Sequence, residues 1–312
     1  MAPLRASGRR LGTVVGLVGL CLLLSALTPY FLTVSNLLNV LEQTAINAVI
    51  AAGMTFVIIS GGIDLSVGSL VALAGVVLAL CLQAQAPLVA AIAAACAAGA
   101  AFGMLNGLAI TWGRLPPFIA TLGMMSIARG CALLFTGGRP VSGFDVDFRH
   151  VATGRFLRVP APVFITLAVY LLGRVVLAET RFGRYVYAMG GNEEATRLSG
   201  VNVRLHKTMV YAVSGLASAI AAVVLTARLN SAQPIAGIMY ELDAIAATVI
   251  GGTSLMGGEG GLGGTIVGAL IMGVLRNGLN LLGVSSFVQQ IVIGLVIVFA
   301  VVIDTSLKSR RP

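Results

Sequence analysis

Long apolar runs follow one another along almost the whole chain, and most charged residues lie in the segments between them. Charged residues make up only 10% of the chain and hydrophobic residues 58%, with a mean hydropathy of +0.99. A soluble globular protein carries about 25% charged residues, so this chain has too little polar surface to be one. The runs are continuous and do not alternate with polar residues, which favours helices over a membrane β-barrel. We therefore predict an all-α polytopic membrane protein.

The apolar runs divide the chain into about ten membrane spans within a single domain of residues 1–312. A helix needs about 20 apolar residues to cross a bilayer, so the run at 241–251 is too short to cross unaided. The run at 11–28 lacks a small-residue cleavage site, and we interpret it as a retained helix and not as a signal peptide. The predicted spans are 11–28, 37–60, 65–82, 87–112, 117–135, 161–177, 208–227, 241–251, 262–282 and 285–303.

The basic residues gather at the ends of apolar runs, so the net charge of +9 is a topology signal and does not indicate nucleic-acid binding. The positive-inside rule places both termini and the loop 179–207 in the cytoplasm. The loop 137–160 is then periplasmic, although it also carries four arginines. The basic residues assigned to the cytoplasm are Arg5, Arg9, Arg10, Arg114, Arg181, Arg184, Arg197, Arg204, Lys207, Lys308, Arg310 and Arg311.

The stretch GGIDLS places two glycines and an aspartate between two apolar runs. Gly61 and Gly62 can end one helix, because glycine tolerates the left-handed conformation of a helix stop. Asp64 or Ser66 can cap the next helix by accepting backbone N–H bonds. A carboxylate at membrane depth costs roughly 2.5–3.5 kcal/mol, and a position at a helix N-terminus lowers that cost. We expect a helix break in which Asp64 caps the third span.

A second stretch resembles the first, since GGIDLSVGS and GGTSLMGGE align without gaps. Paired breaks are typical of transporters, because unwound backbone is tolerated only where it lines a cavity or is buried in protein. The alternative is that both are tight turns packed by small residues. Arg276, Asn277 and Asn280 likewise fit hydrogen bonding between helices. The candidate break and pathway residues are Gly61, Gly62, Asp64, Ser66, Asn106, Gly251, Gly252, Thr253, Ser254 and Asn277.

Three motifs that would mark an ATPase, a zinc protease or a serine hydrolase are absent from the sequence. It has no GxxxxGK[ST] phosphate loop, no HExxH and no GxSxG, so we predict no enzyme activity and no ATPase of its own. His150 and His206 are single loop histidines, and no histidine or carboxylate series within the spans could relay protons. The four cysteines lack metal-ligand spacing, so neither a metal site nor disulfides are expected.

The loop 179–207 contains the pattern of a short helix outside the membrane. Asn192 is a good N-cap, Glu193 and Glu194 suit the first turn, and Gly200 follows its end. An ordinary amphipathic helix at the membrane surface is the alternative. Glu194-Ala195-Thr196 with Gly200 resembles the EAA loop of ABC importer permeases, with threonine in place of the second alanine. The resemblance implies a coupling helix made of Asn192, Glu193, Glu194, Ala195, Thr196, Arg197 and Gly200.

Over nearly its full length the chain resembles the ribose-type permeases of ABC importers. The resemblance rests on GGIDLSVGS, on residues 106–125, on GGTSLMGGEGGLGGT and on residues 277–290. It implies the permease for a monosaccharide in the bacterial inner membrane, built as a homodimer or heterodimer. The implied partners are a cytoplasmic ATPase, which uses ATP and Mg²⁺, and a periplasmic sugar-binding protein. The chain itself is expected to bind no cofactor. The sequence leaves one alternative open, a self-sufficient ion-coupled secondary carrier.

Overall fold

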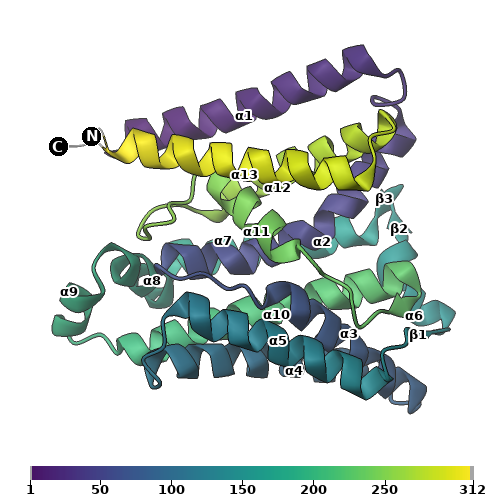
Figure 1. Cartoon of the computed structure of the whole chain (residues 1–312), viewed down its shortest axis with the longest axis horizontal. Helices are drawn as coiled ribbons and strands as arrows, with labels where there is room; N and C mark the ends of the chain where they lie inside the picture. The colour runs from purple at the N-terminus through teal and green to yellow at the C-terminus, as the bar shows by residue number, and fades with distance from the viewer. Residues whose placement is uncertain (1, 310–312) are drawn as a thin grey trace.

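The computed structural model describes residues 2–309, which form a bundle of helices along one long axis (Figure 1). Each of the ten predicted apolar runs coincides with one helix, namely α1–α5, α7 or α10–α13. Arg310 and Arg311, which entered the orientation argument, lie outside the described residues. The helices are α1 (Ala2–Leu27), α2 (Val34–Ile59), α3 (Val67–Gln83), α4 (Leu88–Thr111), α5 (Pro117–Thr136), α6 (Val146–Thr153), α7 (Ala161–Glu179), α8 (Arg181–Gly191), α9 (Glu193–Leu198), α10 (Val203–Leu229), α11 (Tyr240–Ile250), α12 (Leu262–Leu281) and α13 (Ser286–Ser309).

Six of these helices, within residues 2–309, are long and apolar enough to cross a membrane: α2, α4, α5, α7, α10 and α12. The apolar parts of α1, α3 and α13 are shorter, and α11 has 11 residues. The outer helices expose large apolar side chains, among them Phe118 on α5 and Phe287 on α13. Exposed faces of this kind suit contact with lipid chains. The chain is therefore an all-α polytopic membrane protein.

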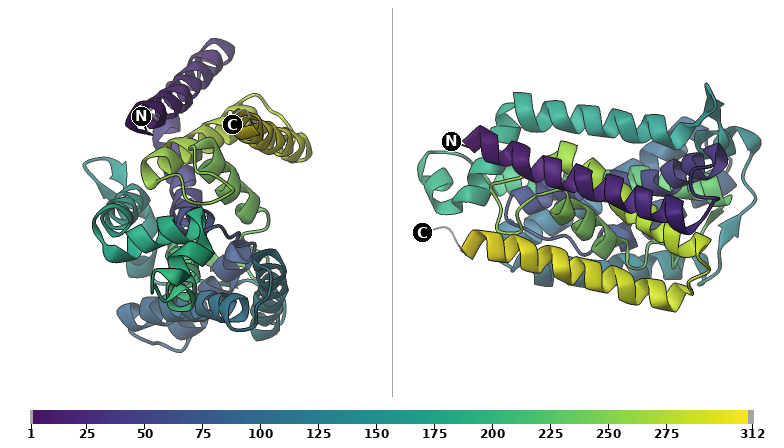
Figure 2. Two further views of the ribbon diagram at one scale, coloured as in Figure 1. Left: turned by 90° about the vertical axis from the view of Figure 1, so that its left-hand side faces the viewer. Right: turned by 90° about the horizontal axis from the view of Figure 1, so that it is seen from above.

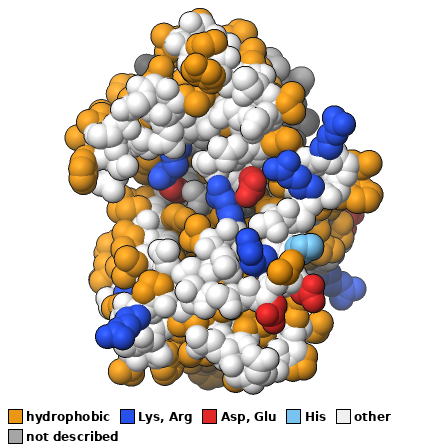
Figure 3. All heavy atoms as spheres, turned by 90° about the vertical axis from the view of Figure 1, so that its right-hand side faces the viewer, with side chains coloured by type: hydrophobic (Ala, Val, Ile, Leu, Met, Phe, Trp, Pro, Cys, Tyr) orange, Lys and Arg blue, Asp and Glu red, His pale blue; other side chains and the backbone are white. Residues whose placement is uncertain are grey.

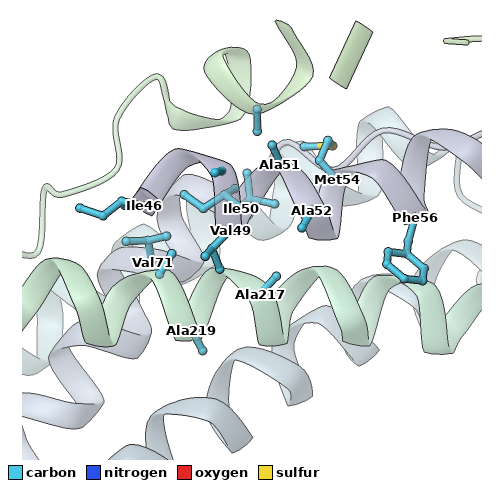
Figure 4. Packing of buried hydrophobic residues seen from close by; sticks show 14 of the residues in the cluster. Ile46, Val49, Ile50, Ala51, Ala52, Met54, Phe56, Val71, Ala217 and Ala219 are labelled. Atoms are coloured by element: carbon cyan, nitrogen blue, oxygen red, sulfur yellow. The ribbon is translucent and has the colours of Figure 1, made fainter. Parts of the chain in front are cut away.

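The buried core lies between α2, α10 and α4. Because the second half of α2, residues 48–59, is almost entirely apolar on all sides, it takes the central position, and all of its side chains are buried. Figure 4 shows Val49 and Ala52 of α2 facing Ala217 of α10. On the other side of α10, Gly99, Gly103 and Gly107 of α4 approach its backbone so closely that a Cβ at Gly103 would collide with the Tyr211 carbonyl. This stripe of glycines brings the two backbones into direct contact, as small residues do in membrane helix pairs.

The two polar loops lie at opposite ends of the molecule (Figures 1 and 2). Helix α1 begins, and α13 ends, at the end that also carries α8 and α9. The loop after α5 lies at the far end, where its strand β1 (Val141–Ser142) pairs antiparallel with β4 (Ser231–Ala232). The same loop contains α6, whose Phe148 is buried, and a hairpin of β2 (Arg155–Phe156) and β3 (Val159–Pro160). The far loop is therefore an ordered cap.

Both Gly–Gly stretches stop a helix in the same way, but the gap-free alignment of the two is wrong by one residue. After α2, the Gly62 N–H bonds to the Val57 carbonyl at 3.0 Å, and Gly61 has a φ of +79°. After α11, the Thr253 N–H bonds to the Thr248 carbonyl at 3.1 Å, and Gly252 has a φ of +91°. Both are Schellman stops with a left-handed glycine. The structural match is therefore Gly61 with Gly252, whereas the sequence alignment pairs Gly61 with Gly251.

The segment that joins α10 to α11, which contains β4 and a series of turns, was not predicted. The chain leaves α10 at Asn230, which is left-handed with a φ of +50°, and reaches α11 only at Tyr240. Arg129 of α5 holds this segment by donating two hydrogen bonds of 2.7 Å from Nη1, to the carbonyls of Pro234 and Ala236. Gly68, in the first turn of α3, packs against the Gly237 backbone. The two shortest apolar helices, α3 and α11, therefore start close to one another inside the bundle.

Candidate translocation and coupling site

Asp64 lies between α2 and α3 and is completely buried. Its Oδ1 accepts hydrogen bonds from the Ser66 N–H at 3.0 Å and from the Ser66 hydroxyl at 2.6 Å. Its Oδ2 accepts a third, of 2.8 Å, from the Ser214 hydroxyl of α10. Hydrogen bonds to a carboxylate are about twice as strong as bonds between neutral groups, and they offset part of the cost of burying the charge. Asp64 thus ties the unwound segment to α10.

The expectation that Asp64 caps α3 is wrong in its detail. The N-cap residue of α3 is Ser66, and its side chain makes no capping hydrogen bond. Asp64 stands two residues earlier and binds the Ser66 N–H, so its carboxylate orders the approach to the helix and not the first turn itself. The physical reason is the bond to Ser214 of α10, because it holds the carboxylate between Ser66 and Ser214 and away from the first turn of α3.

Asn106 of α4 joins this network, as its amide donates to the Ser66 hydroxyl at 2.9 Å. Two fully buried polar atoms beside it, Asn106 Oδ1 and the Tyr211 hydroxyl, have no hydrogen-bond partner among the described residues. The Tyr211 hydroxyl lies against Gly62, where a Cβ would collide with it. Asn106 was predicted from the sequence as a site residue, whereas Tyr211 and Ser214 were not. They could have been predicted from their spacing in the seventh apolar run, which places these two polar groups about one turn apart on one face of the helix.

The second break meets the first at the end of α2. The Gly258 N–H donates to the Ile59 carbonyl at 2.9 Å, and Gly190 of α8 packs against both of these residues. Within the second loop, Thr253 Oγ1 accepts the Gly261 N–H at 3.4 Å, and Ser254 Oγ accepts the Met256 N–H at 3.2 Å. The predicted residues Gly251 and Gly252 end α11, and Gly251 packs against Gly264 of α12.

Asn277 does not join the breaks. It exchanges two hydrogen bonds with Asn36 of α2, of 2.9 and 3.0 Å. Its neighbour Arg276 donates to Asp243 Oδ2 of α11 at 2.7 Å. Both contacts are hydrogen bonds between helices, as the sequence led us to expect for these polar residues. Asp243 was missed, although a carboxylate and a guanidinium in two apolar runs are a signal that they pair.

The loop between α7 and α10 carries two helices, α8 and α9, of which the sequence analysis predicted only the second. Asn192 separates them and caps α9, with its Oδ1 accepting the Ala195 N–H at 2.9 Å. Glu193 and Glu194 occupy the first turn of α9, Thr196 is its buried residue, and Gly200 follows with a φ of +84°. Ala195, Arg197 and Leu198 are exposed, so α9 presents a free outer face at the end of the molecule.

Helix α9 is attached to α10 by one ion pair. Glu193 Oε2 lies 2.6 Å from Lys207 Nζ, and the Lys207 side chain is only 10% exposed. The other ion pair of α9, Glu194 with Arg197, is more than 60% exposed on both sides and adds little stability. Lys207, Tyr211 and Ser214 stand at positions i, i+4 and i+7, which is one face of α10. A single helix face therefore connects α9 with the Asp64 network.

Comparison with known proteins places nearly the whole chain in one family. Residues 36–301 match the family described as "Branched-chain amino acid transport system / permease component". The ribose import permease of Escherichia coli K12 is 50% identical over 317 residues, covering 97% of this chain and 99% of that protein. The ribose import permease of Bacillus subtilis is 50% identical over 298 residues, covering 95% of this chain and 92% of that protein.

Permeases for other sugars are also similar. The D-allose transport system permease of E. coli K12 is 39% identical over 295 residues, covering 94% of this chain and 90% of that protein. No solved structure matches the chain. The relatives named for ribose therefore share more identical residues with this chain than the one named for allose.

Proposed function

This chain belongs to the family of transport-system permease components, and we propose that it is the membrane-spanning subunit of an ATP-driven importer for ribose. The observation that carries the proposal is the full-length identity of 50% to ribose import permeases from both E. coli and B. subtilis. The allose permease is similar over the same length but at 39%. A monosaccharide is thus the substrate class, and ribose is the first choice within it.

In the proposed arrangement, the helices α1–α5, α7 and α10–α13 lie in the bacterial inner membrane. Helix α3 has 17 residues and α11 has 11, and both start inside the bundle, which supports a pathway lined in part by the two breaks. Both termini and the loop with α9 face the cytoplasm, and the loop 137–160 faces the periplasm. The arrangement of these parts at two opposite ends supports this orientation (Figure 2).

The energy for import comes from partner chains. A cytoplasmic ATPase that uses ATP and Mg²⁺ docks on α9, and a periplasmic sugar-binding protein delivers the substrate to the far loop. The exposed outer face of α9 and its attachment to α10 through Glu193 and Lys207 support the docking site. A second permease copy completes the pore. When the ATPases close, α9 moves, and α10 carries the motion to the segment around Asp64.

Complementation tests the proposed substrate. The host is a bacterium from which the ribose permease gene has been deleted and which keeps its own ATPase and binding protein. It receives the gene for this chain together with the genes for the ATPase and binding protein that belong to this chain. Labelled ribose uptake should return, and allose or galactose uptake should be much lower. Uptake of allose or galactose without ribose would overturn the choice of sugar.

A further inference from the structure

A small polar cavity lies between α2, α11 and α12, away from both helix breaks. Its volume is about 30 Å³. A single buried water or hydroxyl group fits such a space, but a whole sugar ring does not. The lining residues other than alanine and glycine are Gln43, Thr44, Asn47, Asp243, Met272 and Arg276.

Two buried oxygen atoms of the cavity lining lack a partner. Thr44 Oγ1 and Asn47 Oδ1 have no hydrogen-bond partner among the described residues, and Thr44 is 5% exposed. Gly273 faces Thr44, and a Cβ there would collide with the threonine hydroxyl. A buried polar group without a partner is destabilising, and most are satisfied in native proteins. The cavity therefore presents one hydroxyl and one acceptor that a polar group entering the cavity can satisfy.

The other polar groups hold these two atoms in place. Asp243 Oδ2 accepts from Asn47 Nδ2 at 3.2 Å and from Arg276 Nη2 at 2.7 Å. Because a carboxylate only accepts, the amide of Asn47 must turn its nitrogen to Asp243, which leaves Oδ1 as the free acceptor. The Asp243 side chain is 3% exposed and that of Arg276 is 40% exposed. The cluster thus runs from a buried carboxylate to the protein surface.

The cluster lies toward the end of the molecule opposite α9. Arg276 stands near the end of α12, and Gln43 follows Glu42, which pairs with Arg228 in the last turn of α10 at 3.2 Å. Figure 3 shows that end of the molecule, where basic and acidic side chains are spread over the face. A substrate that arrives at this end meets these polar groups before it reaches the helix breaks.

We propose that the cavity between α2, α11 and α12 receives one hydroxyl group of the sugar during import. A sugar hydroxyl donates to Asn47 Oδ1 and accepts from the Thr44 hydroxyl, so it satisfies both atoms at once. Arg276 at the surface offers further donors to the neighbouring hydroxyl. The inference rests on the proposed function in that the substrate is a sugar, and it names the residues that contact it.

The test compares a sugar with its monodeoxy analogues. The complete importer, with its ATPase and binding protein, is assayed for maximal uptake of ribose and of each monodeoxyribose. The variants are Thr44→Val, which removes the hydroxyl at nearly the same volume, and Thr44→Ser, which keeps it. Thr55→Val is the matched control, because it removes a buried hydroxyl of α2 that bonds to Thr265 outside the cavity. The same binding protein is used with every permease variant. Its preference for ribose over an analogue therefore contributes equally to every uptake ratio and does not affect the comparison between variants.

In Thr44→Val, the ratio of ribose uptake to the uptake of one analogue should fall by roughly three- to tenfold. That analogue lacks the hydroxyl group that the cavity receives, so it makes no contact with Thr44 that the substitution could remove. Thr44→Ser should keep the wild-type ratio, and Thr55→Val should lower all rates by one factor. If Thr44→Val changes every rate equally, or none, the cavity holds water or is purely structural and the inference fails. If the wild type does not import ribose, the proposed substrate fails instead, and the comparison is repeated with the sugar that is imported.

Discussion

Asp64 shows how this fold accommodates a carboxylate among apolar helices. The side chain is completely buried, and its three hydrogen bonds come from Ser66 and Ser214. A donor left without its acceptor in such a place costs about 1–3 kcal/mol, so the network resists removal of the carboxylate. Both partners donate to Asp64 in all three bonds, and none of the contacts requires that it exchange a proton. Asp64 is therefore a positioning residue in this account.

Substitution of Asp64 separates the hydrogen-bonding role from proton exchange. Asp64→Asn keeps an acceptor for both Ser66 donors, and the Ser214 hydroxyl can turn to accept from the new amide. We expect this variant to keep most of its uptake. Asp64→Leu removes all three bonds and should lose expression or uptake by at least tenfold. Protein level and sugar uptake are measured for both variants in the same cells.

An ion-coupled carrier predicts a different pattern for these variants. Asparagine cannot bind and release a proton, so Asp64→Asn would then be as inactive as Asp64→Leu. A well-expressed but inactive Asp64→Asn variant would contradict the positioning role and favour the carrier.

At the scale of elements, α10 is the connection between the end that carries α9 and the interior. It packs on α2 with one side and on the glycine stripe of α4 with the other. It bears Lys207 near its start and Ser214 two turns later. In the proposed function, α10 carries a displacement of α9 along this face to the Asp64 segment.

The ion pair between α9 and α10 can be tested by exchanging its charges. Lys207→Glu places two like charges at 2.6 Å contact distance, and uptake should fall roughly tenfold, a change of about 1.4 kcal/mol. The double variant Glu193→Lys, Lys207→Glu should recover much of the loss, because the pair is restored in reverse. The measurement is sugar taken up per ATP hydrolysed. No recovery in the double variant would mean that Lys207 acts through something other than Glu193.

The glycine stripe of α4 gives a second test at this scale. Gly103→Ala places a methyl group against the α10 backbone and should destabilise the protein by roughly 1–3 kcal/mol. Gly123→Ala on α5 is the control, because nothing lies within 4 Å of its Cβ position. Thermal unfolding in detergent compares the two, and equal melting temperatures would contradict the close contact of α4 and α10.

The elements that local patterns specify could be predicted, and those that depend on distant contacts could not. The apolar runs located ten helices, the paired glycines located two helix stops, and Asn192 located the start of α9. The segment between α10 and α11 was missed because Arg129 and Gly68, far away in the chain, hold it. The role of Asp64 was assigned to the wrong partner for the same reason, since Ser214 lies 150 residues away.

At the scale of the whole molecule, the chain has two distinct ends. One carries α8, α9, the start of α1 and the end of α13, and the other carries β1, α6 and the β2–β3 hairpin (Figure 1). Across a membrane these ends face different compartments. In the proposed function, the energy source is an ATPase on a partner chain.

Reporter fusions test the orientation of these ends. A fusion after Gly143 should report the periplasm, and fusions after Gly191 or at residue 312 should report the cytoplasm. Alkaline phosphatase and a fluorescent protein serve as complementary reporters. A periplasmic signal at residue 312 would contradict ten crossings of the membrane, because an even number of crossings places both termini on the same side. The short helix α11 would then be the first element whose crossing is reconsidered.

The energy source of uptake is the most direct test of the account. The permease is reconstituted in liposomes with its ATPase inside and its binding protein outside, and labelled ribose uptake is followed. We predict uptake only when ATP, Mg²⁺, the ATPase and the binding protein are all present, with no effect of collapsing the ion gradients. Uptake by the permease alone, driven by a proton or sodium gradient without ATP, would contradict the account.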